Sequence, residues 1–379
     1  MHFQIKRDTL LKSLNFAHNI IERKNTLPIL SNVLLEVKDS RLSIVATDLD
    51  LVFYDEITDL KITKDGSTTT SATVLHDLLR KLPSNLDVIF SLKDENKLSI
   101  SAESSKFNLL CLPVDNFPNF SDSFNNEGIA LNKKGFLSLL NKNKISMSND
   151  ETRHYLNGIF LHTTESNGKF YITGVATDSH RLSSSSMLIE SSGKIKSFIL
   201  PKKTVFQLCS FLEASDEKIL LYSSDTKIQF KIGNSKITSK IIDGKFPDYQ
   251  KVVPKNNSKI LSVNAKDLIN SVERVTTVSI DRKEGVKITL DKDNIQLFVN
   301  SSSSGEGKET LKANYSSDPL TVSFNSRYLL DIASEIEDES ITMNLQDAVS
   351  PVLVLDKSDK QSYFVIMPMK IWKISFLTK

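Results

Sequence analysis

The plan of this chain follows from one segment, Phe3-Gln-Ile-Lys-Arg-Asp-Thr-Leu-Leu-Lys-Ser-Leu14, because the pattern of this segment returns twice further along the chain. It returns as Ile129-Ala-Leu-Asn-Lys-Lys-Gly-Phe-Leu-Ser-Leu-Leu140 and as Leu261-Ser-Val-Asn-Ala-Lys-Asp-Leu-Ile-Asn-Ser-Val272. Each copy alternates apolar and polar residues, passes a polar group suited to a helix start, and continues with apolar residues at helical spacing. The pattern predicts a strand and then an amphipathic helix in each copy, and therefore a chain of three repeats.

A β-hairpin is predicted after each opening. Alternating apolar runs flank polar turns at 38–40, near Gly168 and at 291–294, and such runs around Asp, Asn or Gly are typical of hairpins. The paired strands are expected over 32–37 and 42–48, over 157–162 and 170–178, and over 285–290 and 295–300.

A second helix and further strands complete each repeat. The helices are predicted over 72–82, 202–212 and 326–333, and Ser71 and Ser326 are candidate N-caps. Strands are expected at 88–92, 219–222 and 341–345, and the repeats end alike at Phe117-Pro118, Phe246-Pro247 and Met367-Pro368. The shared order and endings argue against the alternative of three unrelated α+β domains.

The fold class is therefore α+β, with three repeated domains. We expect them over residues 1–126, 127–257 and 258–379, with the polar stretches 121–126 and 255–258 as linkers.

Composition excludes several classes of protein. The chain has 379 residues, and its 48 Lys and Arg nearly balance its 46 Asp and Glu, so contact with nucleic acid would need a local basic patch. Cys111 and Cys209 lie 98 residues apart, which gives neither zinc spacing nor a disulfide framework. The start lacks the apolar core of a signal peptide, and no apolar run is long enough to span a membrane. We expect a cytoplasmic protein with no membrane partner.

Positive charge gathers in the predicted helices. Across 6–24, 73–82, 132–148, 202–213, 265–282 and 326–337, basic residues exceed acidic ones by seven, while acidic residues exceed basic ones by five elsewhere. Basic helices on one side of a curved sheet would form a groove that holds phosphates without reading base sequence. A set of separately solvated helix faces is the alternative.

Two acidic motifs suggest a metal-dependent hydrolase as a rival function. They are Ala46-Thr-Asp48-Leu-Asp50 and Ala176-Thr-Asp178-Ser-His180-Arg181. Both stand at the same place in their repeats, after a strand, so we interpret each Asp as the acceptor for backbone amides in a turn. The loop 301–309 lacks phosphate-loop spacing and is interpreted as a hairpin loop. We expect no catalytic residue, no metal and no cofactor, and we place both cysteines in the core.

Five stretches closely resemble the bacterial DNA sliding clamps, the beta subunits of DNA polymerase III. They are Thr26-Leu-Pro-Ile-Leu-Ser-Asn32, Arg153-His-Tyr-Leu-Asn-Gly158, Ala176-Thr-Asp-Ser-His-Arg-Leu182, Asp243-Gly-Lys-Phe-Pro-Asp-Tyr249 and Val365-Ile-Met-Pro-Met369. The resemblance runs in order from residue 1 to about 371.

The resemblance implies a head-to-tail homodimer in which six domains close a ring, with two helices of each domain inside and antiparallel sheets outside. Such a ring encircles duplex DNA, slides on it and tethers the polymerase alpha subunit, the clamp-loader delta subunit and other proteins with a clamp-binding peptide. A scaffold that never meets DNA is the second rival. Three repeats per chain favour a dimer over a trimeric ring of two-domain units.

Three groups of site residues follow from the resemblance. The partner-peptide pocket would comprise Arg153, Leu156, Thr177, His180, Arg181, Leu182, Pro247, Val252, Val349, Val365, Met367, Pro368 and Met369. The DNA-contacting group would comprise Lys24, Asn149, Asp150, His154, Tyr155, Lys202 and Lys203. The dimer interface would comprise Lys106, Phe107, Leu109, Thr277, Val278, Glu306 and Glu309, with Lys106 facing one of the two glutamates.

The chain departs from the family pattern in four places. His154 replaces a common Tyr, and Lys251 and Lys370 replace common Arg. The chain also continues past the usual end with Trp372-Lys-Ile-Ser-Phe-Leu-Thr-Lys379. We consider two interpretations of this tail: a frayed end, or a segment whose Trp372, Phe376 and Leu377 cover the peptide pocket or that of a neighbouring copy.

Overall fold

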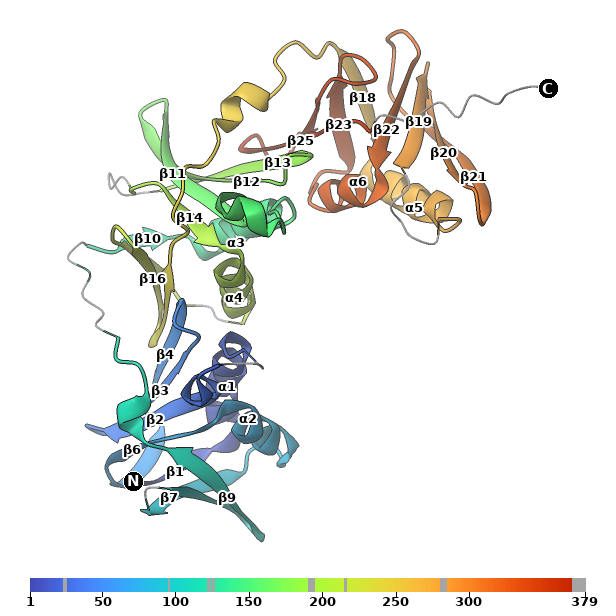
Figure 1. Cartoon of the computed structure of the whole chain (residues 1–379). Coiled ribbons are helices and arrows are strands. Elements are labelled where there is room, and N and C mark those ends of the chain that lie inside the picture. Colours follow the sequence, from blue (N-terminus) through green and yellow to red (C-terminus); the bar gives the residue numbers. More distant parts are fainter. Residues whose placement is uncertain are drawn as a thin grey trace. The chain divides into compact units, whose positions relative to one another are not determined.

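The computed structural model describes residues 1–22, 26–94, 96–120, 124, 127–189, 195–214, 217–279 and 285–369 (Figure 1). Lys24, most of the predicted linker at 121–126, Lys370 and the tail 372–379 lie outside these residues.

The first repeat contains two α-helices, α1 (Arg7–Ile20) and α2 (Ala72–Lys81), and the short helices η1 (Pro28–Ser31) and η2 (Val114–Asn116). Its strands are β1 (His2–Lys6), β2 (Asn32–Lys38), β3 (Arg41–Thr47), β4 (Leu51–Ile57), β5 (Leu60–Lys64), β6 (Gly66–Ser71), β7 (Asp87–Asp94), β8 (Lys97–Ala102) and β9 (Ser105–Leu112).

The second repeat contains α3 (Lys133–Lys144), α4 (Lys202–Glu213), η3 (Glu151–Leu156) and η4 (Tyr249–Val252). Its strands are β10 (Ile129–Leu131), β11 (Gly158–Ser166), β12 (Lys169–Thr177), β13 (Arg181–Leu188), β14 (Phe198–Pro201), β15 (Ile219–Ser223), β16 (Lys227–Ile232) and β17 (Ser235–Lys240).

The third repeat contains α5 (Ala265–Thr276) and α6 (Ser326–Ala333). Its strands are β18 (Lys259–Asn264), β19 (Gly285–Asp291), β20 (Asn294–Ser301), β21 (Gly305–Lys312), β22 (Leu320–Asn325), β23 (Ser340–Leu345), β24 (Val352–Asp356) and β25 (Ser362–Ile366).

The strand–helix openings and the three hairpins are confirmed, and one of the two predicted caps is wrong. Ser71 caps α2, since its hydroxyl accepts from the Val74 amide. Ser326 is instead the first residue of α6, and the side chain of Asn325 accepts from the Tyr328 amide. Asn is as good an N-cap as Ser, and Asn325 stands one residue before the predicted Ser326. The hairpin at 301–309 is confirmed with a shorter turn, because strand β21 already begins at Gly305.

The described residues form two compact units whose boundary lies inside the central repeat. Unit 1 comprises Met1–Leu137, Ile189–Lys196 and Lys203–Ile241, and unit 2 comprises Ser138–Leu188, Ser197–Lys202 and Ile242–Lys379. The reason is that sheets continue across repeats: β17 pairs with β4 in unit 1, and β13 pairs with β25 in unit 2. Each unit thus joins one terminal repeat to a part of the central repeat.

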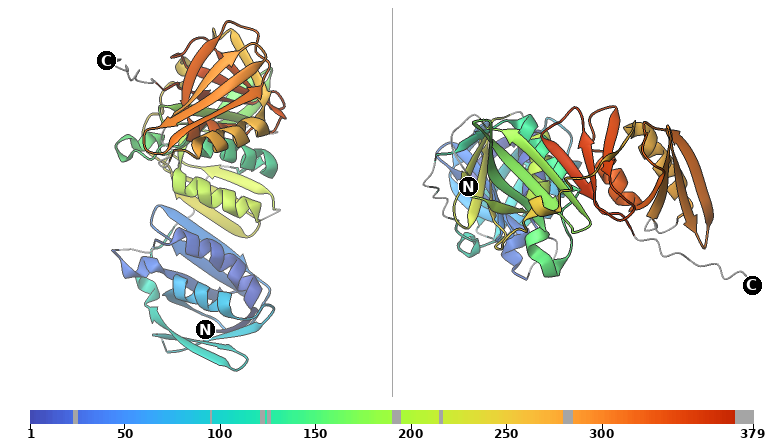
Figure 2. Two further views of the ribbon diagram at one scale, coloured as in Figure 1. Left: turned by 90° about the vertical axis from the view of Figure 1, so that its right-hand side faces the viewer. Right: turned by 90° about the horizontal axis from the view of Figure 1, so that it is seen from above.

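Unit 1 is built on one large antiparallel sheet. Its strand order is β10-β15-β16-β17-β4-β3-β2-β6-β9-β8-β7-β1-β5. Helices α1 and α2 lie side by side on one face of this sheet (Figure 2). The core beneath them contains Leu10 and Leu14 of α1 and a stacked pair, Phe3 and Phe90, whose ring centroids are 4.8 Å apart. Cys111 and Cys209 are buried, as predicted.

Unit 2 contains an eight-stranded sheet, β14-β11-β12-β13-β25-β24-β23-β18, and a four-stranded sheet, β21-β20-β19-β22. Within the third repeat, α5 and α6 pack against the strands. Their residues Leu268, Val272 and Leu329 share one core with buried residues of β19, β20 and β23. Burial of one apolar face per sheet is what each repeat's period-two pattern specified.

One position in the repeated openings makes a different contact in each repeat. It is Phe16 in the first repeat, Lys142 in the second and Arg274 in the third. The Phe16 ring packs at a tilt against the Phe211 ring, with centroids 4.4 Å apart and 51° between the ring planes. The Lys142 ammonium pairs with Asp359 at 2.6 Å and Glu337 at 2.9 Å, although the Lys142 side chain is only 4% exposed. Arg274 pairs with Glu309 at 2.5 Å.

We expect Lys142→Ala to destabilise unit 2 by about 3 kcal/mol, because it leaves a carboxylate without its buried cation. Burial alone would lower the pKa of Lys142, but the two carboxylates outweigh it and raise that pKa. The pKa of Asp359 is lowered, so this stabilisation is lost as the pH falls below the ordinary carboxylate range. Calorimetric unfolding measures the effect. Lys142→Met combined with Asp359→Asn should recover part of the loss, and an unchanged Tm in Lys142→Ala would contradict the argument.

Candidate functional site

The predicted peptide-pocket residues all belong to unit 2 and fall into a buried floor and an exposed rim. We call the set the β25 surface: Arg153, Leu156, Thr177, His180, Arg181, Leu182, Pro247, Val252, Val349, Val365, Met367, Pro368 and Met369. The floor is Leu156, Leu182 and Val365, each at most 3% exposed and packed in one cluster with Phe246. β13 and β25 place Leu182 opposite Val365.

The rim carries large apolar side chains that face solvent. Val252 of η4 is 52% exposed, Val349 60%, and Met367 and Met369 38% each. The chain after β25 is fixed by two backbone hydrogen bonds, from the Met367 amide to the His180 carbonyl at 2.8 Å and from the Met369 amide to the Ser323 carbonyl at 2.7 Å. Exposed apolar side chains around a fixed backbone are typical of a docking surface.

A turn between β12 and β13 presents His180 on this surface. The Asp178 carboxylate accepts from the amides of His180 and Arg181, at 2.9 and 3.0 Å. Ser179 between them adopts a left-handed backbone, with φ 78°. The first repeat builds the same turn: Asp48 accepts from the amides of Asp50 and Leu51. Both aspartates are therefore turn acceptors, as predicted, and this geometry gives no support to the hydrolase alternative.

Arg181 is held inside the protein. Its side chain is 8% exposed, and it pairs with Asp178 at 3.1 Å and with Asp331 of α6 at 2.6 Å. The guanidinium also lies 4.2 Å from the centroid of the Tyr328 ring. These contacts tie the β12–β13 turn to α6. No pattern in the sequence points to Tyr328 and Asp331, since only the fold brings α6 to this turn.

Arg153 is the more accessible arginine. Its Nε donates to Asp150 at 2.8 Å and its Nη1 to the hydroxyl of Ser179 at 2.6 Å, yet its side chain stays 37% exposed. Hydrogen bonds from Thr152 and Arg153 lower the pKa of Asp150 to about 2. This pair fixes η3 against the β12–β13 turn and leaves guanidinium N–H groups at the rim.

The predicted DNA-contacting residues divide between the two units. In unit 2, Asn149 and His154 are exposed, Lys202 donates to the Asn149 side chain, and His154 contacts the Asp243 carbonyl at 3.1 Å. Tyr155 is half-buried and belongs to the floor cluster of the β25 surface. Burial, and then the charges of Arg181 and Arg327, lower the pKa of Lys202.

Counting charges along the helices overstated their basic faces. Lys142 was counted as a basic helix residue, but it is buried against two carboxylates. Lys203, in unit 1, pairs with Asp48 and with Glu22, the latter at 3.2 Å. Both ammonium groups are therefore already paired with carboxylates. A count of charges along a helix misses this, because helical position alone does not tell whether an acidic side chain faces the ammonium.

Five of the seven predicted dimer-interface residues lie on β9 or β21, two strands that each have an open edge. Residues 105–110 of β9 pair with β8 on one side and have no strand partner on the other within the described part of the chain. β21 is likewise an edge strand. Phe107 faces the same side as its cross-strand partner Ile100, which is fully buried, but is itself 36% exposed. The core of unit 1 therefore continues to an uncovered edge.

In unit 2, the acidic residues of the predicted interface differ in their surroundings. Glu309 of β21 accepts from Ser271 at 2.6 Å and pairs with Arg274, both on α5. Glu306 is exposed. Thr277 is exposed and Val278 half-buried against the core at the end of α5.

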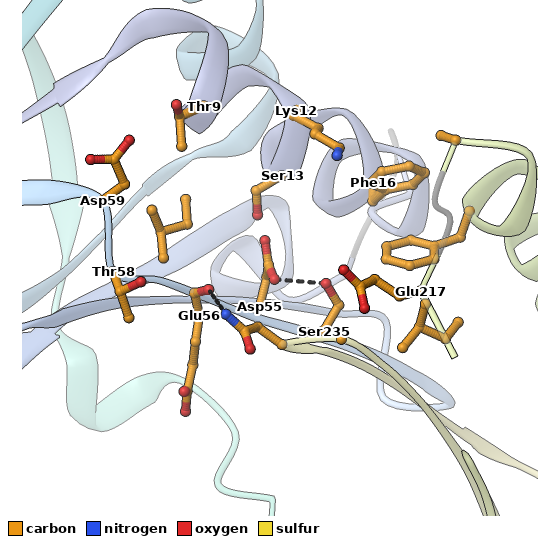
Figure 3. A pocket seen from close by; sticks show the side chains of 16 residues that line it. Thr9, Lys12, Ser13, Phe16, Asp55, Glu56, Thr58, Asp59, Glu217 and Ser235 are labelled. Atoms are coloured by element: carbon orange, nitrogen blue, oxygen red, sulfur yellow. Dashed lines mark hydrogen bonds between the residues drawn. The ribbon is translucent and has the colours of Figure 1, made fainter. Parts of the chain in front are cut away.

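Unit 1 also contains a cavity of about 390 Å³ that no predicted site residue lines. It lies where α1 faces β4, the end of α4 and the start of β17 (Figure 3). Asp55 stands in it and accepts from Ser235 at 2.7 Å, and burial raises the pKa of Asp55. No histidine lines the cavity, so this Ser–Asp pair lacks the base that a nucleophile would need.

Among the described residues, no group of His, Cys, Asp and Glu is arranged to hold a metal ion. Within the same part of the chain, no helix is long and apolar enough to cross a membrane.

Comparison with known proteins gives consistent matches along the chain. Family models for the DNA polymerase III beta subunit match in order: the N-terminal domain over residues 1–121, the central domain over 130–248 and the C-terminal domain over 250–370. The beta sliding clamp of Caulobacter vibrioides is 37% identical over 373 residues, covering 98% of this chain and all of that protein. The Escherichia coli K12 clamp is 32% identical over 371 residues, with the same coverage.

Solved structures of sliding clamps also match this chain over nearly its whole length. A Caulobacter crescentus beta sliding clamp with bound PEG superposes with a TM-score of 0.94 at 36% identity, covering 98% of this chain and 99% of that one. A Bartonella birtlesii sliding clamp bound to griselimycin has a TM-score of 0.92 at 37% identity, covering 98% and 100%.

Proposed function

Because the chain belongs to the DNA polymerase III beta-subunit family of bacterial sliding clamps, non-catalytic processivity factors of DNA replication, we propose that it acts as a homodimeric ring around duplex DNA. The observation that carries this proposal is the match of all three clamp domains, in order, over residues 1–121, 130–248 and 250–370. The domains proposed from the repeats are residues 1–126, 127–257 and 258–379.

The ring closes when the open edge of β9 meets the edge strand β21 of a second protomer. Each chain offers one edge of each kind, so the contact is heterologous and two copies form two identical seams. Phe107 and Leu109 then complete an apolar layer against Thr277 and Val278 of the partner. Glu306, which is exposed, is the better carboxylate for Lys106, because Glu309 is already held by Arg274.

DNA is held through phosphates and without base reading. Asn149, His154 and Lys202 supply contacts of this kind in unit 2, and hydrogen bonds and charges to phosphates position DNA without specifying its sequence. Asp150 belongs to the same group by its place beside Asn149, and its carboxylate accepts from Arg153 Nε at 2.8 Å. Its role is to hold Arg153 and η3 in place.

Partner proteins bind the β25 surface through short peptides. The polymerase alpha subunit and the clamp-loader delta subunit are the partners we propose, in the cytoplasm where the chromosome lies. The exposed methionines suit varied peptides, because Met adapts its shape to irregular partners. Arg153 orients a polar peptide end, and Arg181 acts as a positioning residue.

Retention on circular DNA tests the proposal. The protein is loaded on nicked circular DNA with the family's loader complex, the DNA is linearised, and bound protein is followed by gel filtration at moderate salt. We expect retention on circles and at least a tenfold loss after linearisation, because a closed ring slides off ends. Equal retention on both forms would contradict encirclement. No retention on either would favour the scaffold alternative, once the loader is shown to load its own clamp.

A further inference from the structure

The rim of the β25 surface is left open by the residues that the structure describes. Val252, Val349, Met367 and Met369 are each more than a third exposed, whereas the floor residues Leu156, Leu182 and Val365 are buried in one cluster. Near Val349, the Asp347 carboxylate accepts from the amides of Val349 and Ser350 at 2.9 and 2.7 Å. These amide hydrogen bonds lower the pKa of Asp347, so its negative charge persists at neutral pH. No ion pair involves Asp347 within the described residues. The β25 surface therefore combines exposed apolar side chains with the negative charge of the Asp347 carboxylate.

The chain carries a segment of matching character immediately after this surface. Residues 371–379, Ile-Trp-Lys-Ile-Ser-Phe-Leu-Thr-Lys, contain five large apolar residues, two lysines and no acid. The C-terminal family model stops at residue 370, and the Caulobacter vibrioides clamp is matched over its whole length by 98% of this chain. The segment is thus an addition relative to the family pattern.

We propose that residues 371–379 bind the β25 surface of their own protomer and compete there with partner peptides. This inference rests on the peptide-binding role proposed above for that surface. Trp372, Phe376 and Leu377 are the anchors for the apolar rim, and Lys373 is the cation for Asp347. The segment is basic and apolar, and the surface offers exposed apolar side chains and one carboxylate to match it.

The point of attachment supports this occupant. Met369 is itself a rim residue, and its amide is fixed to the Ser323 carbonyl. Trp372 is the third residue after Met369, and an extended chain spans about 10 Å over three residue steps. Trp372 is therefore confined close to the rim.

Tethering makes even a weak contact effective. A short flexible tether gives an effective concentration in the millimolar range. A segment that would bind with a Kd of about 100 μM as a free peptide then occupies its surface about nine-tenths of the time, and a competing peptide binds about tenfold more weakly.

The test measures the Kd of a fluorescent peptide, Gln-Leu-Ser-Leu-Phe, for the full chain and for a chain ending at Lys370. We expect the truncated chain to bind about tenfold more tightly. A variant combining Trp372→Ala, Phe376→Ala and Leu377→Ala should match the truncation, whereas the control Thr378→Ala should match the full chain. A synthetic 371–379 peptide should displace the probe from the truncated chain.

Each outcome of this test separates the two proposals. Equal Kd values for the full and truncated chains would overturn the inference while leaving the docking surface intact. Absence of probe binding to either chain would instead overturn the peptide-binding role of the surface, and the inference with it. A gain on truncation that appears only at high protein concentration would show binding to another copy and would overturn the assignment to the same protomer.

Discussion

Phe107→Asp is expected to turn the dimer into a monomer. Phe107 points to the buried side of the unit 1 sheet, level with the fully buried Ile100, at an edge that has no strand partner among the described residues. In the closed ring this carboxylate would be buried without a cation. Such a charge costs several kcal/mol, and a cost of about 4 kcal/mol at each of the two seams raises the dissociation constant by about five to six powers of ten. Sedimentation velocity near 1 μM measures the change.

Ile260→Asp is the matched control for the dimer prediction. Ile260 is more exposed than Phe107, at 56%, and its cross-strand partner is the polar Asn344. The same charge there should leave the dimer intact. A second readout is retention on circular DNA, which Phe107→Asp should abolish because an open ring does not enclose DNA. A dimer that survives Phe107→Asp would place the seam elsewhere.

The repeated plan was predictable because it depends on local patterns. Alternating strands, polar turns and helical spacing occur within each segment, and the structure confirms the openings and hairpins at nearly the predicted bounds. The prediction of Ser326 as a cap failed because Asn325, one residue earlier, suits the position equally well. The pairing of β4 with β17 was beyond local reasoning, since it joins segments about 185 residues apart and moves the compact boundary into the central repeat.

The site was predictable only through the resemblance. An alternating run such as β13 predicts a buried face, but it does not distinguish the floor of a pocket from an ordinary core. The burial of Leu182 is consistent with either. Charged residues were misjudged for the same reason. Lys142 and Arg181 look solvent-facing in sequence, yet both are buried against acidic partners from the third repeat. Their partners are near them only after the sheets of unit 2 have formed.

Partner peptides are expected to bury the exposed apolar side chains at the rim of the β25 surface. A variant combining Val349→Ala and Met367→Ala should bind partner peptides about 30- to 100-fold more weakly. Each substitution removes apolar surface that a docked peptide would bury, at about 1–1.5 kcal/mol per side chain. The free protein should keep its stability, because these side chains are 60% and 38% exposed and support little of the core.

Fluorescence titration in the chain ending at Lys370 measures this effect without competition from residues 371–379. Leu27→Ala is the matched control, since Leu27 is an exposed apolar residue, at 50%, just before η1 in unit 1. Its peptide Kd should stay within twofold. If both variants weaken the peptide equally, the loss does not come from the rim, and the assignment of the β25 surface as the docking site fails. If only the rim variant does, partner peptides contact Val349 or Met367 directly, because the floor of Leu156, Leu182 and Val365 is unchanged in both proteins.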